Sequence, residues 1–153
     1  IFAAVRMRDT LYIAGGLWYS KIKSLISRII FKKTGDSPMN VIFYQKADGS
    51  YPVVDFLATL DEKMRAKVTR SLKLLEAEGH LLRAPNSKEL TDGIMELRTT
   101  FAGNISRILY FFIIGNTAIV TNGFIKKTQK TPPEEIERAK AYRRDYQRRN
   151  PSC

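Results

Sequence analysis

Three consecutive hydrophobic runs, separated by Gly-Asn pairs, constrain the fold of this chain more than any other feature. The runs span residues 94–101, 105–114 and 117–126, and the breaks between them contain Gly103-Asn104 and Gly115-Asn116. Gly-Asn pairs between short β-prone runs are typical of tight hairpins, because both residues tolerate the positive φ angles of such turns. The pattern therefore predicts an antiparallel meander of three strands.

Helical patterns precede this meander. Pro52 suits the first turn of a helix over residues 52–59. Asp61 and Glu62 open a longer helix in which apolar residues recur at helical spacing, and Gly79 is a natural end for it. Two helices are therefore expected before the meander.

One further helix follows the meander. Thr131 and Glu134 have the spacing of a capping box, with Pro132 at the first helical position, which predicts a helix running to about Gln147. Residues 41–45 are short and β-prone. The element order predicts an α+β fold: a small domain whose antiparallel sheet has two N-terminal helices and a C-terminal helix.

The N-terminal segment differs from the remainder. Residues 34–38 are turn-rich, and Met39 stands immediately before the first strand pattern. We interpret residues 1–38 as an extension outside the native domain, Met39 as the natural start and residues 39–153 as the domain. Residues 11–19 are too few to span a bilayer, which needs about 20 apolar residues. We expect no membrane contact, although a basic amphipathic helix over 18–33 on a membrane surface is an alternative.

The charge balance indicates an anionic partner. Lysine and arginine number 26 against 15 aspartates and glutamates, a net charge of +11, which favours nucleic acid or a membrane surface. The single cysteine, Cys153, excludes disulfides and cysteine-based zinc sites, and it fits a reducing cytosol. We therefore expect a cytoplasmic location.

The expected turns allow the pairing of the meander to be worked out. Two-residue turns at Gly103-Asn104 and Gly115-Asn116 would pair Arg98 with Leu109, Thr100 with Arg107, Leu109 with Asn122, Arg107 with Phe124, and Ile105 with Lys126. Directly paired residues share a face of the sheet. Five residues then converge on one side: Arg98, Arg107, Asn122, Phe124 and Lys126. A loop of odd length would break this parity.

Two interpretations of this basic face remain open. It is either an anion-binding face or a structural salt-bridge cluster, because Glu96 lies on the same side and could pair with an arginine. Arginine matches phosphate through its planar fork and an aromatic ring can stack on a base, which favours single-stranded RNA. Glu96 is the one carboxylate on the face, so we expect no metal and no other cofactor.

Further basic residues surround the C-terminal helix. Lys130 precedes it, and Arg143 and Arg144 lie within it. They either extend the electrostatic footprint of an RNA-binding surface or complement the negative end of the helix.

Residues 96–146 resemble the RelE/HigB toxins of bacterial type II toxin–antitoxin pairs, most closely their phage-derived HigB-like branch. The resemblance depends on an L-R pair on one strand, R-I-L-Y-F on the next, and G-F-x-K-K-T-x-K-T-P before a terminal helix. The upstream Y-P-V-V-D-F-L-A-T-L-D also fits the first helix of that branch. The resemblance covers about residues 40–148.

This resemblance implies a RelE-like fold and an mRNA endoribonuclease that acts on the ribosome. It also implies a cognate helix-turn-helix antitoxin, through which the complex would reach operator DNA. Arg98 and Arg107 match basic strand positions that hold the phosphate, and Lys126 and Lys127 match the end of the last strand. Which lysine takes part in chemistry, and which group is the general acid, are left open.

The implied chemistry needs no metal. The ribose 2′-hydroxyl would attack the adjacent phosphorus and give a cyclic phosphate and a free 5′-hydroxyl, with the arginines stabilising the developing charge. One alternative is a gyrase-targeting toxin of the ParE kind. Another is a non-catalytic nucleic-acid-binding module.

Overall fold

The computed structural model describes residues 5–6 and 38–152. The described part contains a six-stranded sheet with the order β1-β2-β6-β5-β4-β3 and three α-helices, which confirms the α+β prediction. The strands are β1 (Val5–Arg6), β2 (Asn40–Phe43), β3 (Ser87–Thr91), β4 (Ile94–Phe101), β5 (Asn104–Ile113) and β6 (Thr117–Ile125). The helices are α2 (Pro52–Thr59), α3 (Glu62–Glu78) and α4 (Pro133–Arg149), with a short 3-10 turn, η1, at Gly79–Leu81.

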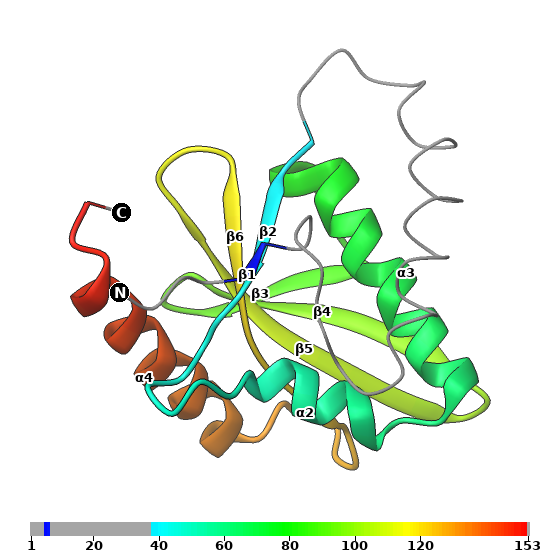
Figure 1. The fold of residues 1–153 in the computed structure, drawn as a ribbon. Coiled ribbons are helices and arrows are strands. Elements are labelled where there is room, and N and C mark those ends of the chain that lie inside the picture. The colour runs from blue at the N-terminus through cyan, green and yellow to red at the C-terminus, as the bar shows by residue number, and fades with distance from the viewer. Residues whose placement is uncertain (1–4, 7–37, 153) are drawn as a thin grey trace.

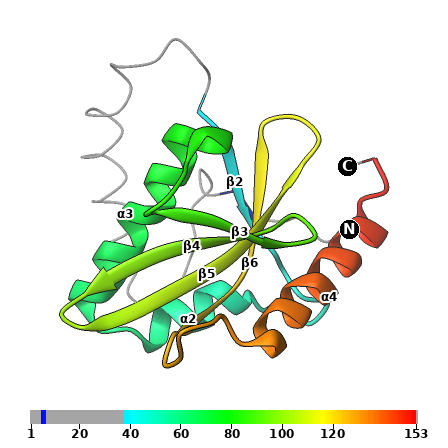
Figure 2. The ribbon, with the colours of Figure 1, turned by 180° about the vertical axis from the view of Figure 1, so that it is seen from behind.

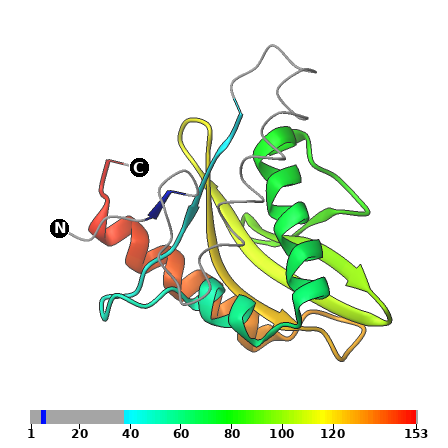
Figure 3. The same ribbon diagram turned by 45° about the vertical axis from the view of Figure 1, so that its right-hand side comes forward.

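The helices cover both faces of the sheet (Figures 1 and 2). Helices α2 and α3 bury one face, and α4 packs against the other, so that α3 and α4 lie on opposite sides in Figure 3. Strand β2 pairs with β6 in parallel, whereas every other pair is antiparallel. The sheet is therefore mostly, not entirely, antiparallel.

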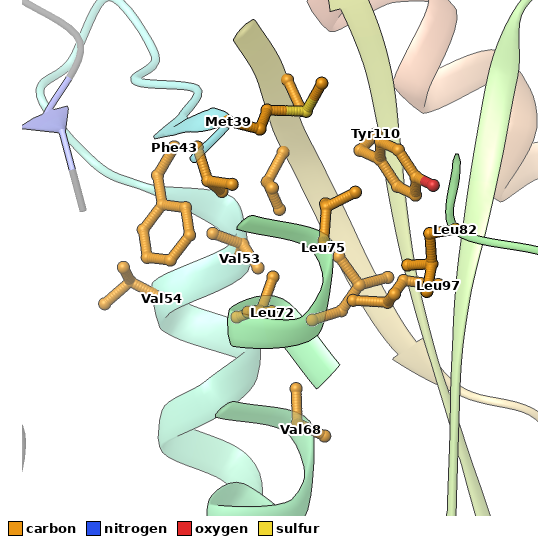
Figure 4. Packing of buried hydrophobic residues seen from close by; sticks show 14 of the residues in the cluster. Met39, Phe43, Val53, Val54, Val68, Leu72, Leu75, Leu82, Leu97 and Tyr110 are labelled. Atoms are coloured by element: carbon orange, nitrogen blue, oxygen red, sulfur yellow. The ribbon is translucent and has the colours of Figure 1, made fainter. Parts of the chain in front are cut away.

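The larger core lies between the sheet and helices α2 and α3 (Figure 4). Val68, Leu72 and Leu75 of α3 face it at helical spacing and are fully buried. Helix α3 begins where predicted, because the Asp61 side chain accepts a hydrogen bond from the backbone N–H of Met64 at 2.9 Å. It ends at Gly79, whose φ of +54° suits glycine.

The turn of the first hairpin lies one residue earlier than expected, which shifts the strand pairing by two residues. Its turn is Ala102-Gly103, and Arg98 lies directly opposite Arg107. The predicted pairings of Arg98 with Leu109 and of Thr100 with Arg107 are therefore wrong. Both turn residues have positive φ, 49° and 80°. Hairpin turns of this kind prefer glycine at the second central position, which is where Gly103 lies.

The second hairpin reaches the expected pairing by a different route. Its loop has three residues between Ile113 and Thr117, and a bulge between Ile108 and Tyr110 compensates for the odd loop length. Arg107 consequently lies opposite Phe124, as predicted. The predicted pairing of Leu109 with Asn122 falls at the bulge.

Two local predictions need correction. Strand β3 was not predicted, because its sequence, SKELT, lacks the apolar alternation of a half-buried strand. The capping box at α4 was also wrong: Pro132 is the N-cap without a side-chain cap, Pro133 occupies the first helical position, and the Thr131 hydroxyl contacts Glu96 instead.

Candidate functional site

Adjacent strands bring Arg98 and Arg107 together on the sheet face that α4 partly covers. Arg98 on β4 pairs directly with Arg107 on β5, and Arg107 pairs with Phe124 on β6. The prediction that the two arginines share a face is therefore confirmed, although the strand pairing is shifted by two residues from the expected one.

Glu96 lies at the centre of this face and is completely buried, with 0% of its surface exposed. Its Oε1 atom accepts a hydrogen bond from Arg98 Nε at 2.9 Å. The Nε of Arg107 lies at the same distance from that oxygen, as an ion pair that is not aligned as a hydrogen bond. The Oε2 atom accepts a hydrogen bond from the hydroxyl of Thr131.

The surroundings keep Glu96 ionised. Burial alone would raise the pKa of its carboxyl, but the hydrogen bonds from Thr131 and Arg98 and the charges of Arg107 and Lys126 outweigh burial, so the pKa lies below its usual value. Burial is also the main reason that the pKa of Arg107 is lowered, and the Glu96 charge opposes this. Glu96 is therefore a buried anion held by cations.

Lys126 completes the group from the end of β6. Its backbone N–H donates to the carbonyl of Ile105 at 2.7 Å, which fixes the chain where it leaves the sheet. Burial and the charges of Arg107, Arg98 and Lys88 lower the pKa of Lys126, while Glu96 raises it. A lysine with a lowered pKa has more of its amine in the neutral form near pH 7, and only the neutral form can accept a proton.

Sequence reasoning missed Lys88 and Thr131 and left Glu96 outside the site. Lys88 lies directly opposite Glu96 on β3, so it joins the same face. The sequence could not place Lys88 on this face, because strand β3 itself was not predicted. Four cations, Lys88, Arg98, Arg107 and Lys126, then surround one carboxylate, and this leaves three positive charges uncompensated within the group.

The other predicted site residues lie in different surroundings. Lys127 and Lys130 are exposed on the segment between β6 and α4. Phe124 is half-buried on the site face. Asn122 is buried beneath α4, where its amide nitrogen donates to the Glu135 carboxylate at 2.9 Å.

The two helix arginines also differ from one another. Arg143 donates to the backbone carbonyl of Asp92 in the β3–β4 turn, and the neighbouring Lys140 forms an ion pair with Asp92 at 2.9 Å. These contacts hold the β3–β4 hairpin against α4. Arg144 is exposed on the outer surface of that helix.

Among residues 5–6 and 38–152, no group of three or more His, Cys, Asp or Glu side chains could hold a metal ion. No helix in the described part is long and apolar enough to cross a membrane.

The fold and the site define a small α+β protein with arginines and lysines gathered on one face of its sheet. Residues 55–144, more than half of the chain, match the family described as phage-derived protein Gp49-like, and the chain belongs to this family. The family is one of RelE/ParE-like toxins. A comparison with curated proteins gave no match.

Proposed function

We propose that this protein is the toxin of a type II toxin–antitoxin pair and that it cleaves mRNA on the ribosome without a metal ion. The observation that carries the proposal is the convergence of Arg98, Arg107 and Lys126 on one buried carboxylate. Together with Lys88, these cations exceed the single charge of Glu96 by three, so positive charge remains for a second anion. A phosphate in the RNA backbone is an anion of suitable charge and shape.

Arg98 is the best placed of the two arginines to meet that phosphate. Its side chain is 29% exposed, against 9% for Arg107. It binds Glu96 through Nε, and among the described residues no group hydrogen-bonds its terminal amino groups. Arg107 also donates to the carbonyl of Ser106 at 3.0 Å, so its guanidinium is more fully engaged by the protein.

The reaction would be an internal transfer of the phosphate. The 2′-hydroxyl oxygen attacks the adjacent phosphorus as its proton leaves, the bond to the 5′ oxygen breaks, and that oxygen takes up a proton. The products are a 2′,3′-cyclic phosphate and a 5′-hydroxyl. Arg98 would stabilise the charge that develops on the phosphorus oxygens.

Lys126 or Lys127 would assist the proton transfers. The lowered pKa of Lys126 favours it as the proton acceptor, because more of its amine is neutral near pH 7 than that of an ordinary lysine. The ribosome would supply the remaining rate enhancement by holding the mRNA in position. Phe124, beside Arg107, offers a ring on which a base could stack.

The proposed partners follow from this activity. The toxin would act in the cytoplasm on mRNA that a ribosome is translating, and a cognate helix-turn-helix antitoxin would block it. Exposed Lys127, Lys130 and Arg144 would add to the attraction for RNA.

Induced expression in bacteria tests the proposal against its alternatives. We expect growth arrest with new mRNA 5′ ends inside translated regions, detected by ribosome profiling. Arg98→Ala should relieve the arrest. Arg70→Ala removes the same charge from an exposed position of α3 on the other side of the sheet, and it should not relieve the arrest.

Two results would contradict the proposal. Arrest with intact mRNA and altered plasmid supercoiling would favour a gyrase-targeting toxin. Binding to RNA without new 5′ ends would favour a non-catalytic nucleic-acid-binding module.

A further inference from the structure

The contact between Glu96 and Thr131 joins two parts of the site that come from different elements. Glu96 lies on β4, whereas Thr131 lies on the segment that leads from β6 to α4. That segment carries Lys126, Lys127 and Lys130. The two oxygens of the carboxylate are divided between the arginines, which contact Oε1, and the Thr131 hydroxyl, which contacts Oε2.

A fully buried carboxylate among cations is not a simple source of stability. Desolvation of buried charges often outweighs their mutual attraction, and apolar replacements can stabilise a protein equally well. Glu96 also cannot itself contact a substrate, since it is 0% exposed. We therefore look for the role of Glu96 in the side chains that it orients.

We propose that Glu96 and Thr131 form a positioning unit that holds Arg98, Arg107 and the β6–α4 lysines in one arrangement around the scissile phosphate. Thr131 fixes the rotation of the carboxylate through Oε2, and the carboxylate fixes the two guanidinium groups through Oε1. The same hydrogen bond anchors the segment that carries the lysines. This inference rests on the proposed function for the identity of the anion and for the effect on catalysis, whereas the contacts among Glu96, Thr131 and the arginines do not depend on it.

The variant that tests the unit most cleanly is Thr131→Val, because it keeps the shape of the side chain and removes only the hydroxyl donor. We expect kcat for mRNA cleavage on ribosomes to fall roughly 10²-fold, the size of effect that a misplacement of about 1 Å can have. KM should change little, since the exposed basic surface is intact. Thr131→Ser restores the hydroxyl and should restore most of kcat.

Thr121→Val is the matched control. The Thr121 hydroxyl is buried and donates to the Leu109 carbonyl at 3.0 Å, so its loss removes one hydrogen bond from the same sheet without touching Glu96. A similar fall in melting temperature for both valine variants, with a fall in kcat for Thr131→Val alone, would separate positioning from stability.

A second measurement needs neither ribosomes nor RNA. The side-chain Nε–Hε NMR signals of Arg98 and Arg107 report their contacts with Glu96 directly. In Thr131→Val both signals should shift relative to wild type, and in Thr121→Val they should not. Unchanged signals in Thr131→Val would overturn the unit, as would shifted signals with an unchanged kcat.

The two proposals fail in distinguishable ways. A wild-type protein that does not cleave mRNA contradicts the proposed function and with it the catalytic part of this inference. The arginine signals would then still decide whether Thr131 orients the carboxylate and guanidinium groups.

Discussion

At the scale of single residues, the arrangement of the basic face depends most on Glu96. Replacing it with glutamine removes the charge that compensates Arg98 and Arg107, while nearly preserving the shape of the side chain. Loss of one partner from a buried ion pair leaves an uncompensated charge and costs on the order of 3 kcal/mol. We expect Glu96→Gln to lower the free energy of unfolding by about this amount, measured by urea denaturation at pH 7. A loss below about 0.5 kcal/mol, within the range of ordinary surface substitutions, would show that the cluster contributes little to stability.

The pH dependence of stability offers an independent test of the same residue. The pKa of Glu96 lies below its usual value in the folded protein, mainly because the Thr131 and Arg98 hydrogen bonds outweigh burial. An unfolded glutamate has a pKa of about 4.3, so the ionised cluster contributes fully to stability above that pH. Its contribution is lost as the pH falls through the lower folded pKa.

The stability gap between wild type and Glu96→Gln should therefore shrink progressively below about pH 4.3. Urea titrations from pH 7 to pH 3 would measure this gap. A gap that stays constant over that range would mean that Glu96 is not the titrating group.

The two arginines should respond differently to truncation. Arg107 is mostly buried against Glu96, so Arg107→Ala should lower both the melting temperature and the rate of mRNA cleavage. Arg98 is more exposed, so Arg98→Ala should chiefly lower the rate, by about 10²–10³-fold if it stabilises the developing charge. Arg107→Lys should rescue only partly, because a single ammonium cannot reproduce the planar fork. A stable Arg107→Ala protein with full activity would remove Arg107 from the site.

At the scale of elements, the contact between α2 and β6 gives a sharp test of packing. A Cβ atom added at Gly123 of β6 would overlap the ring of Phe56 on α2. Gly123→Ala should therefore force α2 to shift, at a cost of about 1–3 kcal/mol. Phe56→Ala should largely relieve that cost, so the double variant would be less destabilised than the sum of the single variants. Additive losses in thermal unfolding would contradict the contact.

The elements themselves also show what the sequence could predict. Helices α2 and α3 and the meander carry strong local signals, such as Pro52, Asp61 and the two Gly-Asn pairs. Both helices and all three strands of the meander are present in the structure. Strand β3 carries no such signal, because it lies at the sheet edge with most of its side chains exposed. The cap of α4 was missed because Thr131 binds a residue 35 positions away, which no local motif can reveal.

The two arginines lie on the predicted face, although both hairpin turns differ from the expected ones. The first turn lies one residue earlier than predicted. This shifts the strand pairing by two residues, an even number, so Arg98 and Arg107 stay on a common face. In the second hairpin, a three-residue loop would have reversed the faces, and the bulge restored them. Strand parity was thus predictable, whereas the burial of Glu96 and the inclusion of Lys88 needed the complete sheet.

At the scale of the whole molecule, the relation of residues 1–38 to the domain stays a prediction. Of these residues the structure describes 5–6 and 38, and Val5 and Arg6 pair with β2. Met39 is 2% exposed, and its backbone N–H donates to the Glu76 carbonyl at 2.8 Å. A chain that begins at Met39 keeps this anchor, so we expect it to fold with a melting temperature within a few degrees of the full chain. Loss of the folded state, seen by circular dichroism, would show that the N-terminal segment belongs to the domain.

The central claim is that the basic face around Glu96 cleaves mRNA on the ribosome. The most direct measurement adds the purified protein to a reconstituted translation system and maps the RNA ends over time. We expect cuts in mRNA held by ribosomes, with 5′-hydroxyl and cyclic phosphate ends, little cutting of free mRNA, and rates at least about 10²-fold lower for Arg98→Ala. Intact mRNA with the wild-type protein, or equal rates for wild type and a folded Arg98→Ala protein, would contradict the claim.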